Sequence, residues 1–487
     1  MYKRQRLQIP LIYGIDAVHG HNNVYGATIF PQNIGLGATN NPELVFKISE
    51  ATSIEVAATG IDWTFSPCLS SPEDYRWGRT YEGYSSDPAL VEKLGEASVM
   101  GYQSAQTNSG KKVVACAKHF IGDGNTEFGT GMNGLVDRGN TVLTVDELKE
   151  KLLPKYQAAI EADVQTIMAS YNSWNGVKCH GSKELLTDIL KIELGFEGFV
   201  ISDWQGIDEI PGNYKTDIIT SINAGIDMVM VSGQGQPYKK FMRLLKESVE
   251  EGSIPLARID DAVTRIIKVK LRNGLFENPI VKNDALEVIG SDSHRDIARQ
   301  AVRESMVVLK NQDIIPISKN SKSIVVAGRG ADNLGMQCGG WTINWQGGQG
   351  DITIGTTILD GIKKAVSDST EIIYSEDGSG VVPNSDNIAV VVIGEDPYTE
   401  MKGDSDQLYL SAKDKKSIDE VGFNNTASIF SISESSNMGG KIGWIEEESL
   451  SQKIIDELKN TKINERFRSS ETVEQLSLIH ISEPTRL

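Results

Sequence analysis

The sequence contains few cysteines, and these lie far apart. Among its 487 residues are only Cys68, Cys116, Cys179 and Cys338, with no CxxC pair and no Cys/His spacing typical of a metal site. Disulfide frameworks and structural zinc sites both need cysteines in pairs or close clusters. We therefore expect scattered buried thiols, no metal ion and no cofactor.

Basic charge and long apolar runs are also scarce. The 48 lysines and arginines stand against 66 aspartates and glutamates, which gives a net charge of −18. Nucleic acids and anionic membrane surfaces both require a basic face, so we expect neither as a partner. The longest apolar runs, such as residues 388–393, are far too short to cross a membrane, and residues 1–11 lack the apolar stretch of a signal peptide. We expect a soluble chain.

Short apolar runs alternate with helical patterns over the first 275 residues. The runs predict strands at residues 11–15, 113–117, 165–170, 199–202 and 226–231. The helical patterns between them predict helices at residues 42–59, 145–162 and 182–194. This alternation is typical of a parallel sheet covered by helices, either doubly wound or closed into a barrel.

Polar residues follow directly after several of these predicted strands. They are Asp16 and His19, Lys118 and His119, Tyr171 and Asn172, and Asp203 and Trp204. In a (β/α)₈ barrel such positions form the rim on which active sites are built. The pattern therefore favours an α/β fold with a TIM-like barrel.

A second α/β region follows a change of pattern near residue 278. A polar connector leads to a predicted helix at 294–310 and to buried-strand runs at 324–327 and 388–394. We predict a barrel domain at residues 6–275, a linker at 276–300 and a partial α/β sandwich domain at 301–421.

The two ends of the chain differ in character from the rest. Residues 422–475 are a polar tail with one short helical pattern at 449–459, and residues 476–487, LSLIHISEPTRL, resemble translated sequencing-adaptor DNA. The opening YKRQ resembles the same adaptor read on the opposite strand. We therefore expect a natural gene product cut at both ends.

The segment GFVISDWQGI, residues 198–207, carries the strongest chemical signal. Its apolar residues form a strand that presents Asp203 at the carboxyl end. A carboxylate held there by backbone donors stays ionised and can attack an electrophile. The alternative is an aspartate that caps the following helix, and spacing alone leaves both readings open.

Three other segments place polar side chains at the same rim. ACAKHFIGDG carries Lys118 and His119, GIDAVHG carries Asp16, and YRWGRTY carries Arg79, a side chain suited to bidentate recognition of hydroxyls or carboxylates. Each signal is weak alone, and a salt-bridged lysine beside a core histidine is the simpler reading of the first. Together they describe a polar pocket with interleaved aromatic residues, which is what carbohydrate recognition needs.

Eight blocks of the sequence, in order from about residue 8 to residue 410, carry a family resemblance. They are IPLIYGIDAVHGHNNVYGATIFPQNIGLGA, RWGRTYEGYSSD, ACAKHFIGDG, SYNSWNGVK, GFVISDWQGID, RIDDAVTRIIKVK, GLFENP and ADNLGMQCGGWTINWQG. The chain resembles glycoside hydrolase family 3, and within it the plant-type exo-β-glucanases and bacterial β-glucosidases.

The resemblance implies a role for each rim residue. Asp203 matches the nucleophile that forms a covalent glycosyl-enzyme. The residues that match those binding the hydroxyls of the non-reducing-end sugar in the −1 subsite are Asp16, Arg79, Lys118 and His119. Tyr171 matches the pocket wall beside the nucleophile, and Trp204 and Trp345 match the aromatic pair that holds the next sugar in the +1 subsite.

The acid/base glutamate that such an enzyme needs is not found by the same comparison. The resemblance places it downstream of the Trp345 block in a motif like GSEG, and the family-like pattern ends near residue 421. Glu395 and Glu400, in GEDPYTEMKGD, match a different block, and later glutamates stand in unrelated contexts: Glu434, Glu446, Glu447 and Glu448. The first strands of the barrel are also expected to be missing from this sequence. Glu209 stands at a position where some relatives have arginine.

The resemblance implies a retaining, exo-acting β-glucosidase or glucan β-glucosidase. Its substrates are expected to be β-glucans or cello- and laminari-oligosaccharides, and family resemblance favours an extracellular or periplasmic location. The alternatives are a catalytically dead sugar-binding fragment, a family 3 β-N-acetylhexosaminidase and a β-xylosidase. Oligomeric state is left unpredicted.

Overall fold

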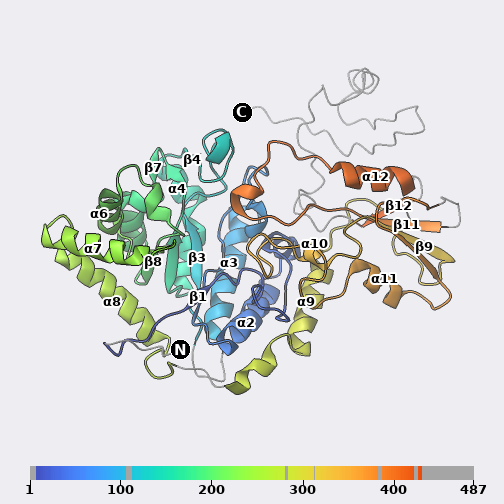
Figure 1. Ribbon diagram of the computed structural model, residues 1–487, viewed down its shortest axis with the longest axis horizontal. Coiled ribbons are helices and arrows are strands. Elements are labelled where there is room, and N and C mark those ends of the chain that lie inside the picture. The colour runs from blue at the N-terminus through green and yellow to red at the C-terminus, as the bar shows by residue number, and fades with distance from the viewer. Residues whose placement is uncertain are drawn as a thin grey trace. The chain divides into compact units, whose positions relative to one another are not determined.

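The computed structural model describes most of the chain as two compact units (Figure 1). The described residues are 7–105, 112–279, 283–311, 313–381, 387–421 and 426–429. Unit 1 consists of Met1–Met306, Leu334–Gly355 and Asp396–Leu408, and unit 2 of Val307–Asn333, Thr356–Glu395 and Tyr409–Leu487. Two segments that follow residue 306 therefore belong to unit 1. The predicted division of the chain into contiguous domains does not include this arrangement.

Some sequence-based expectations fall outside the described residues. They concern the predicted helix at 449–459, the segment 476–487, the four late glutamates and, apart from residues 426–429, the tail at 422–475.

The principal strands of unit 1 are parallel and follow one another in chain order. β1 (Gly14–Ile15) pairs with β2 (Trp63–Thr64), and β3 (Cys116–Phe120) pairs with β5 (Thr166–Ala169), which pairs with β8 (Phe199–Ile201). Isolated parallel bridges join Trp63 to Val114 and Ile201 to Met228. The first bridge links β2 to the segment before β3, and the second adds a further parallel segment beside β8. The prediction of an α/β fold is confirmed, and closure of these strands into a barrel stays a prediction.

The central strands of unit 1 are buried, whereas both residues of β1 are half-buried. Every residue of β3, β5 and β8 is buried, as expected for parallel strands covered on both faces. At the centre, Trp63 packs edge-on against Phe65 and Phe199, with ring centroids 4.7 and 5.3 Å away, and its Nε1 donates to Thr166 Oγ1.

Helices and a small side sheet surround these strands. The side sheet consists of β4 (Asn140–Thr141), β6 (Ser173–Trp174) and β7 (Val177–Lys178). The helices of unit 1 include α1 (Asn33–Thr39), α2 (Pro42–Ala58), α3 (Pro88–Ser104), α4 (Val145–Lys151), α5 (Leu153–Glu161), α6 (Tyr214–Ala224), α7 (Pro237–Glu250), α8 (Leu256–Arg272), α9 (Asp292–Ser305) and α10 (Leu334–Cys338). A π-helical segment spans Glu184–Glu193.

Several elements differ from the sequence-based prediction. The helix expected at 145–162 divides at Leu152 into α4 and α5, because Pro154 lacks an N–H and is accommodated only in the first turn of a new helix. The strand expected at 113–117 is described at Cys116–Phe120, so Lys118 and His119 lie within β3. The run at 226–231 contributes a single bridge at Met228.

Unit 2 is built around a four-stranded parallel sheet in the order β10 (Glu371–Ser375), β9 (Ser323–Ala327), β11 (Asn387–Val392), β12 (Thr426–Ile429). Alternate residues of β9 lie on opposite faces of the sheet. Ile324 and Val326 pack in the cluster that contains α11 (Ile358–Ala365), while Val325 and Ala327 pack in the cluster that contains α12 (Ala412–Val421). A helix thus covers each face of this sheet.

No described helix of either unit combines the length and the apolar character that a membrane span requires.

The aromatic centre of unit 1 gives a stability prediction. Phe199 is fully buried, so Phe199→Ala should lower the free energy of unfolding by about 3–5 kcal/mol through lost burial and a residual cavity. Ile192→Ala is a matched control because Ile192 is 70% exposed, and it should change stability by less than about 0.5 kcal/mol. Urea denaturation measures both, and equal effects would contradict this account of the core.

Candidate active site

Asp203 lies just beyond β8, with one carboxylate oxygen bound and the other unbound. Its Oδ1 accepts a hydrogen bond from the backbone N–H of Trp204 at 2.6 Å, and its own backbone N–H donates to Nε2 of His180 at 3.0 Å. Burial lowers the pKa of His180 to about 4, which keeps the imidazole neutral and able to accept. Asp203 Oδ2 is buried without a hydrogen bond and lies 3.5 Å from His119 Nε2.

Nearby cations keep the Asp203 carboxyl ionised. Burial by itself raises the pKa of this group, but His119, Arg79, Lys118 and the backbone N–H of Trp204 together outweigh it, and the pKa lies below its ordinary value. The helix-cap alternative does not fit, because Gln205 is the residue that precedes the short helix Gly206–Glu209. A buried, ionised carboxylate with one free oxygen is suited to attack an electrophilic carbon.

Lys118 and Asp16 form the first ion pair of the site. Lys118, on β3, is almost fully buried, and its Nζ lies 3.2 Å from Asp16 Oδ1 just after β1. Burial lowers the pKa of Lys118, but Asp16 and Glu82 raise it more, so the ammonium stays charged. The Asp16 side chain keeps 34% of its surface exposed and is free to accept further hydrogen bonds.

Arg79 forms the second pair, with a partner that sequence reasoning missed. Its Nε and Nη2 each bind one carboxylate oxygen of Glu82 at 2.8 Å, and both side chains are buried. Burial raises the pKa of Glu82, but Arg79 and Lys118 lower it to about 2 overall. The i, i+3 spacing in RTYE was the available signal for this pair.

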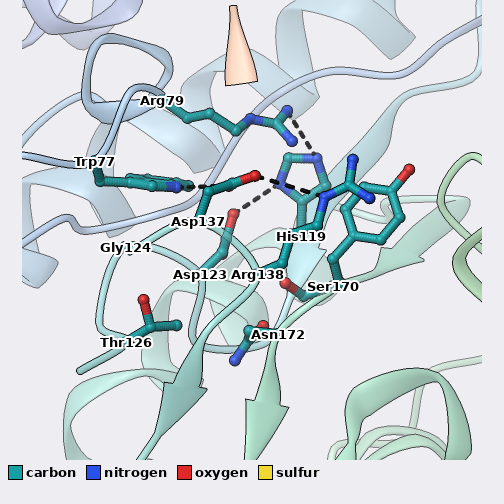
Figure 2. A pocket seen from close by; sticks show the side chains of 11 residues that line it. Trp77, Arg79, His119, Asp123, Gly124, Thr126, Asp137, Arg138, Ser170 and Asn172 are labelled. Atoms are coloured by element: carbon teal, nitrogen blue, oxygen red, sulfur yellow. Dashed lines mark hydrogen bonds and ion pairs between the residues drawn. The ribbon is translucent and has the colours of Figure 1, made fainter. Parts of the chain in front are cut away.

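His119 lies between Arg79 and a second missed carboxylate, Asp123 (Figure 2). Its Nδ1 is 2.7 Å from Asp123 Oδ2, and its Nε2 is 3.1 Å from Arg79 Nη2. Burial and Arg79 oppose a charge on this ring, but Asp123 outweighs them and raises the pKa of His119 to about 9. Asp123 therefore favours the charged form of this ring.

The three aromatic residues predicted to line the site differ in their burial and in their contacts. The Tyr171 hydroxyl donates to the carbonyl oxygen of Trp204 at 2.5 Å, and Trp204 itself is 61% exposed. Trp345 is 42% exposed, and among the described contacts none joins its ring to the other predicted residues. Its carbonyl oxygen accepts from the N–H of Trp341, whose buried ring lies 5.4 Å from Lys118 Nζ. Sequence reasoning had not singled out Trp341.

Glu400 lies in this site, although the sequence comparison had set it aside. The returning segment Asp396–Leu408 carries it, and Arg138 Nη2 donates to its Oε2 at 3.3 Å. Burial raises its pKa; Arg79 and Arg138 lower it, Asp203 and Glu82 raise it, and the net pKa lies above the ordinary value. The site therefore contains two carboxyl groups with opposite ionisation tendencies.

One cluster among the described residues offers three potential metal ligands. Cys68, His119 and Asp123 have donor atoms within 4.8 Å of one another. Asp123 Oδ2 already accepts from Ser70 Oγ at 2.6 Å and contacts His119 at 2.7 Å. These hydrogen bonds account for the cluster, and we assign no ion to it.

Family models match both parts of the chain. The model of the glycosyl hydrolase family 3 N-terminal domain matches residues 1–269, and that of the family's C-terminal domain matches residues 306–449. The chain belongs to glycosyl hydrolase family 3. The resemblance inferred from the eight blocks is confirmed, and the second match continues beyond residue 421, where those blocks had faded.

Individual relatives agree with this family. The chain is 34% identical to a lysosomal beta glucosidase of Dictyostelium discoideum, over 82% of this chain and 51% of that protein. It is 31% identical to a beta-xylosidase of Formosa agariphila, over 86% and 61%. The crystal structure of an exo-1,3/1,4-beta-glucanase from a Pseudoalteromonas species superposes with a TM-score of 0.78 at 40% identity, over 86% and 53%. The chain thus spans about half to three fifths of the length of these relatives.

The charge on His119 generates a testable prediction. Asp123→Asn removes the anion that favours the imidazolium, so the pKa of His119 should fall from about 9 toward or below 6.5. A raised folded-state pKa contributes stability that is present below about pH 6.5 and is lost as the pH rises through about 9, so the variant should lose this part of the pH dependence. Side-chain ¹⁵N NMR titration measures the pKa, with the signal assigned by His119→Asn, and an unchanged value in Asp123→Asn would contradict the assignment.

Proposed function

We propose that this family 3 chain is a retaining, exo-acting β-glucosidase or glucan β-glucosidase. The observation that carries the proposal is Asp203, a buried carboxylate with one oxygen atom free of hydrogen bonds, which nearby cations keep ionised. Retaining hydrolysis requires one carboxylate nucleophile and one neutral acid beside it.

In the first step, an acid/base carboxyl, which the family resemblance places downstream of Trp345 and which we assign to no residue, gives its proton to the glycosidic oxygen while Asp203 Oδ2 attacks the anomeric carbon. The bond to the leaving sugar breaks, and a glycosyl ester forms on Asp203. In the second step, that carboxyl, now ionised, removes a proton from water, and the oxygen of that water replaces Asp203 at the same carbon. The sugar leaves with its anomeric configuration retained, and both carboxyl groups return to their starting states.

The ion pairs around Asp203 suit the −1 sugar. Asp16 and Glu82 accept hydrogen bonds, Lys118, Arg79 and His119 donate them, and adjacent hydroxyls of a terminal glucose need both kinds of partner. The exposed rings of Trp204 and Trp345 suit the apolar face of the next sugar, and Tyr171 the wall beside the nucleophile. β-Glucans and cello- or laminari-oligosaccharides are the substrates we propose, in line with the name of the exo-1,3/1,4-beta-glucanase relative.

The proposal extends to the architecture. The parallel succession of β1, β2, β3, β5 and β8 supports a TIM-like barrel domain at residues 6–275. The helix-covered parallel sheet of unit 2 supports an α/β sandwich domain at 301–421.

Loss of the nucleophile tests the role of Asp203. Asp203→Asn removes the charge that attacks the anomeric carbon, so it should abolish turnover of a phenyl β-glucoside and of a dinitrophenyl glucoside, whose leaving group needs no proton. Asp208→Asn is the control, because Asp208 is an exposed carboxylate on the same loop as Asp203. This variant should keep wild-type rates.

Turnover of either glucoside at the wild-type rate in Asp203→Asn would contradict its role as the nucleophile. A wild-type chain that binds glucose but hydrolyses neither glucoside would instead favour the sugar-binding alternative. Faster turnover of phenyl β-xyloside than of the glucoside would favour the β-xylosidase alternative.

A further inference from the structure

We propose that Asp404 is a positioning residue of the site, because its carboxylate holds the loop that carries Arg79. The inference rests on the proposed function only where it concerns turnover, since the contacts that carry it involve no substrate. Asp404 lies on the segment Asp396–Leu408, which belongs to unit 1, whereas the residues on both sides of this segment belong to unit 2. The family resemblance assigned no role to Asp404.

Both carboxylate oxygens of Asp404 accept hydrogen bonds from backbone N–H groups of two different loops. Oδ1 accepts from Gly78 at 2.7 Å, and Oδ2 accepts from Asp137 at 2.7 Å and from Val136 at 3.2 Å. Burial raises the pKa of Asp404, and these three donors oppose that shift. Hydrogen bonds to a charged acceptor are stronger than those between neutral groups, so Asp404 ties the two loops to one point.

The loop at Gly78 and the segment that carries Asp404 approach each other too closely for a side chain at the contact. A Cβ atom added to Gly78 would lie 2.5 Å from the carbonyl oxygen of Glu400 and 2.6 Å from the backbone nitrogen of Asp404. One added to Gly403 would lie 2.9 Å from the Cα of Gly78. Glycine permits this approach of two backbones, and the contact leaves the Gly78 backbone little room to move.

A side-chain hydrogen bond joins the two loops directly. The Nε1 of Trp77, the residue before Gly78, donates to Asp137 Oδ1 at 2.9 Å (Figure 2). Asp404 binds Gly78 on one loop and Asp137 on the other, so the three contacts close a ring. Side chains of a site are held precisely when hydrogen bonds behind them fix their backbone, and this ring fixes the backbone at Gly78.

Arg79 directly follows Gly78, so its guanidinium extends from the backbone that Asp404 holds. Its Nη2 lies 3.1 Å from His119 Nε2, and its charge helps to keep the pKa of Asp203 low. The bond between Arg79 and Glu82 does not replace the contact with Asp404. Glu82 lies on the short helix Thr80–Glu82 that Arg79 precedes, so a displacement of this loop would move both residues together. Asp404 therefore acts on the site through Arg79.

Loss of the Asp404 carboxylate should change the pKa of His119 with no substrate present. Arg79 opposes a charge on the His119 ring, so Asp404→Ala, which lets the guanidinium move away, should raise this pKa above about 9. Asp404→Asn should raise it less, because its one remaining oxygen can still hold one of the two loops. Side-chain ¹⁵N NMR titration measures the pKa in each variant.

A double-mutant cycle decides whether Asp404 acts through Arg79. Arg79→Gln should also raise the pKa of His119, and adding Asp404→Ala should raise it no further, because the guanidinium is already gone. An unchanged pKa in Asp404→Ala, or a full further rise in the double variant, would overturn the proposal. Asp87→Ala is the matched control. Asp87 also holds a backbone N–H, that of Ala89 at the start of α3, so its loss should lower stability and leave the pKa of His119 in place.

Turnover of a dinitrophenyl β-glucoside gives the second test, and this one rests on the proposed function. Asp404→Ala should lower kcat/KM by about 10²-fold, because a small displacement of a binding group is costly in the transition state. In the Arg79→Gln background the same change should cost no more than about twofold. Losses that multiply in the double variant would show that Asp404 does not act through Arg79.

The two measurements separate this inference from the function on which the second one rests. If the wild-type chain hydrolyses no β-glucoside, the proposed function fails, and the pKa of His119 still decides the role of Asp404. Thermal melts show whether each variant is folded. Asp404→Asn keeps the shape of the side chain and carries both tests if Asp404→Ala is unfolded.

Discussion

A buried carboxylate remains ionised only when cations surround it, and the architecture of this site follows from that constraint on Asp203. The cations are His119, Arg79 and Lys118. Burying each of these cations is unfavourable unless an anion lies next to it. Each cation has one. Asp123, Glu82 and Asp16 are these anions, so the site is an alternating network of charges around one free oxygen atom.

The same network explains why the second carboxyl behaves differently. Glu400 is added to a region that already holds Asp203 and Glu82, so a further negative charge there is unfavourable and its pKa is raised. Arg138 offsets this effect in part and is itself divided between carboxylates. The pKa of Glu400 therefore lies above its ordinary value, whereas the pKa of Asp203 lies below its own.

Much of this site could be predicted from the sequence, because parallel strands bring their carboxyl ends to one edge. Asp16, Lys118, His119, Tyr171 and Asp203 could be found in this way, and the α/β class followed from the alternation of runs. Glu400 could not, because it returns to unit 1 from a segment far downstream of Asp203, a long-range placement that local patterns do not encode. Glu82 and Asp123 belong to the site because they pair with Arg79 and His119, and strand position alone does not identify them. Arg138 follows β3 only after a long loop.

The family resemblance supplied roles that local patterns could not. It assigned Asp203 and the residues expected to bind the sugar through short motifs, and it left the acid/base glutamate unassigned. The division of α4 from α5 at Leu152 was readable from Pro154, whereas the shift of β3 toward residue 120 depends on pairing with β5.

The central claim is that Asp203 Oδ2 forms a bond to the anomeric carbon. An activated 2-deoxy-2-fluoro-β-glucoside slows the second step more than the first, so a glycosyl ester should accumulate on the intact chain. Peptide mass spectrometry after proteolysis tests this claim most directly. We expect the added fluoroglucosyl mass on the peptide that contains Asp203, and the same mass on a different carboxylate, or a turnover that never accumulates labelled protein, would contradict the account.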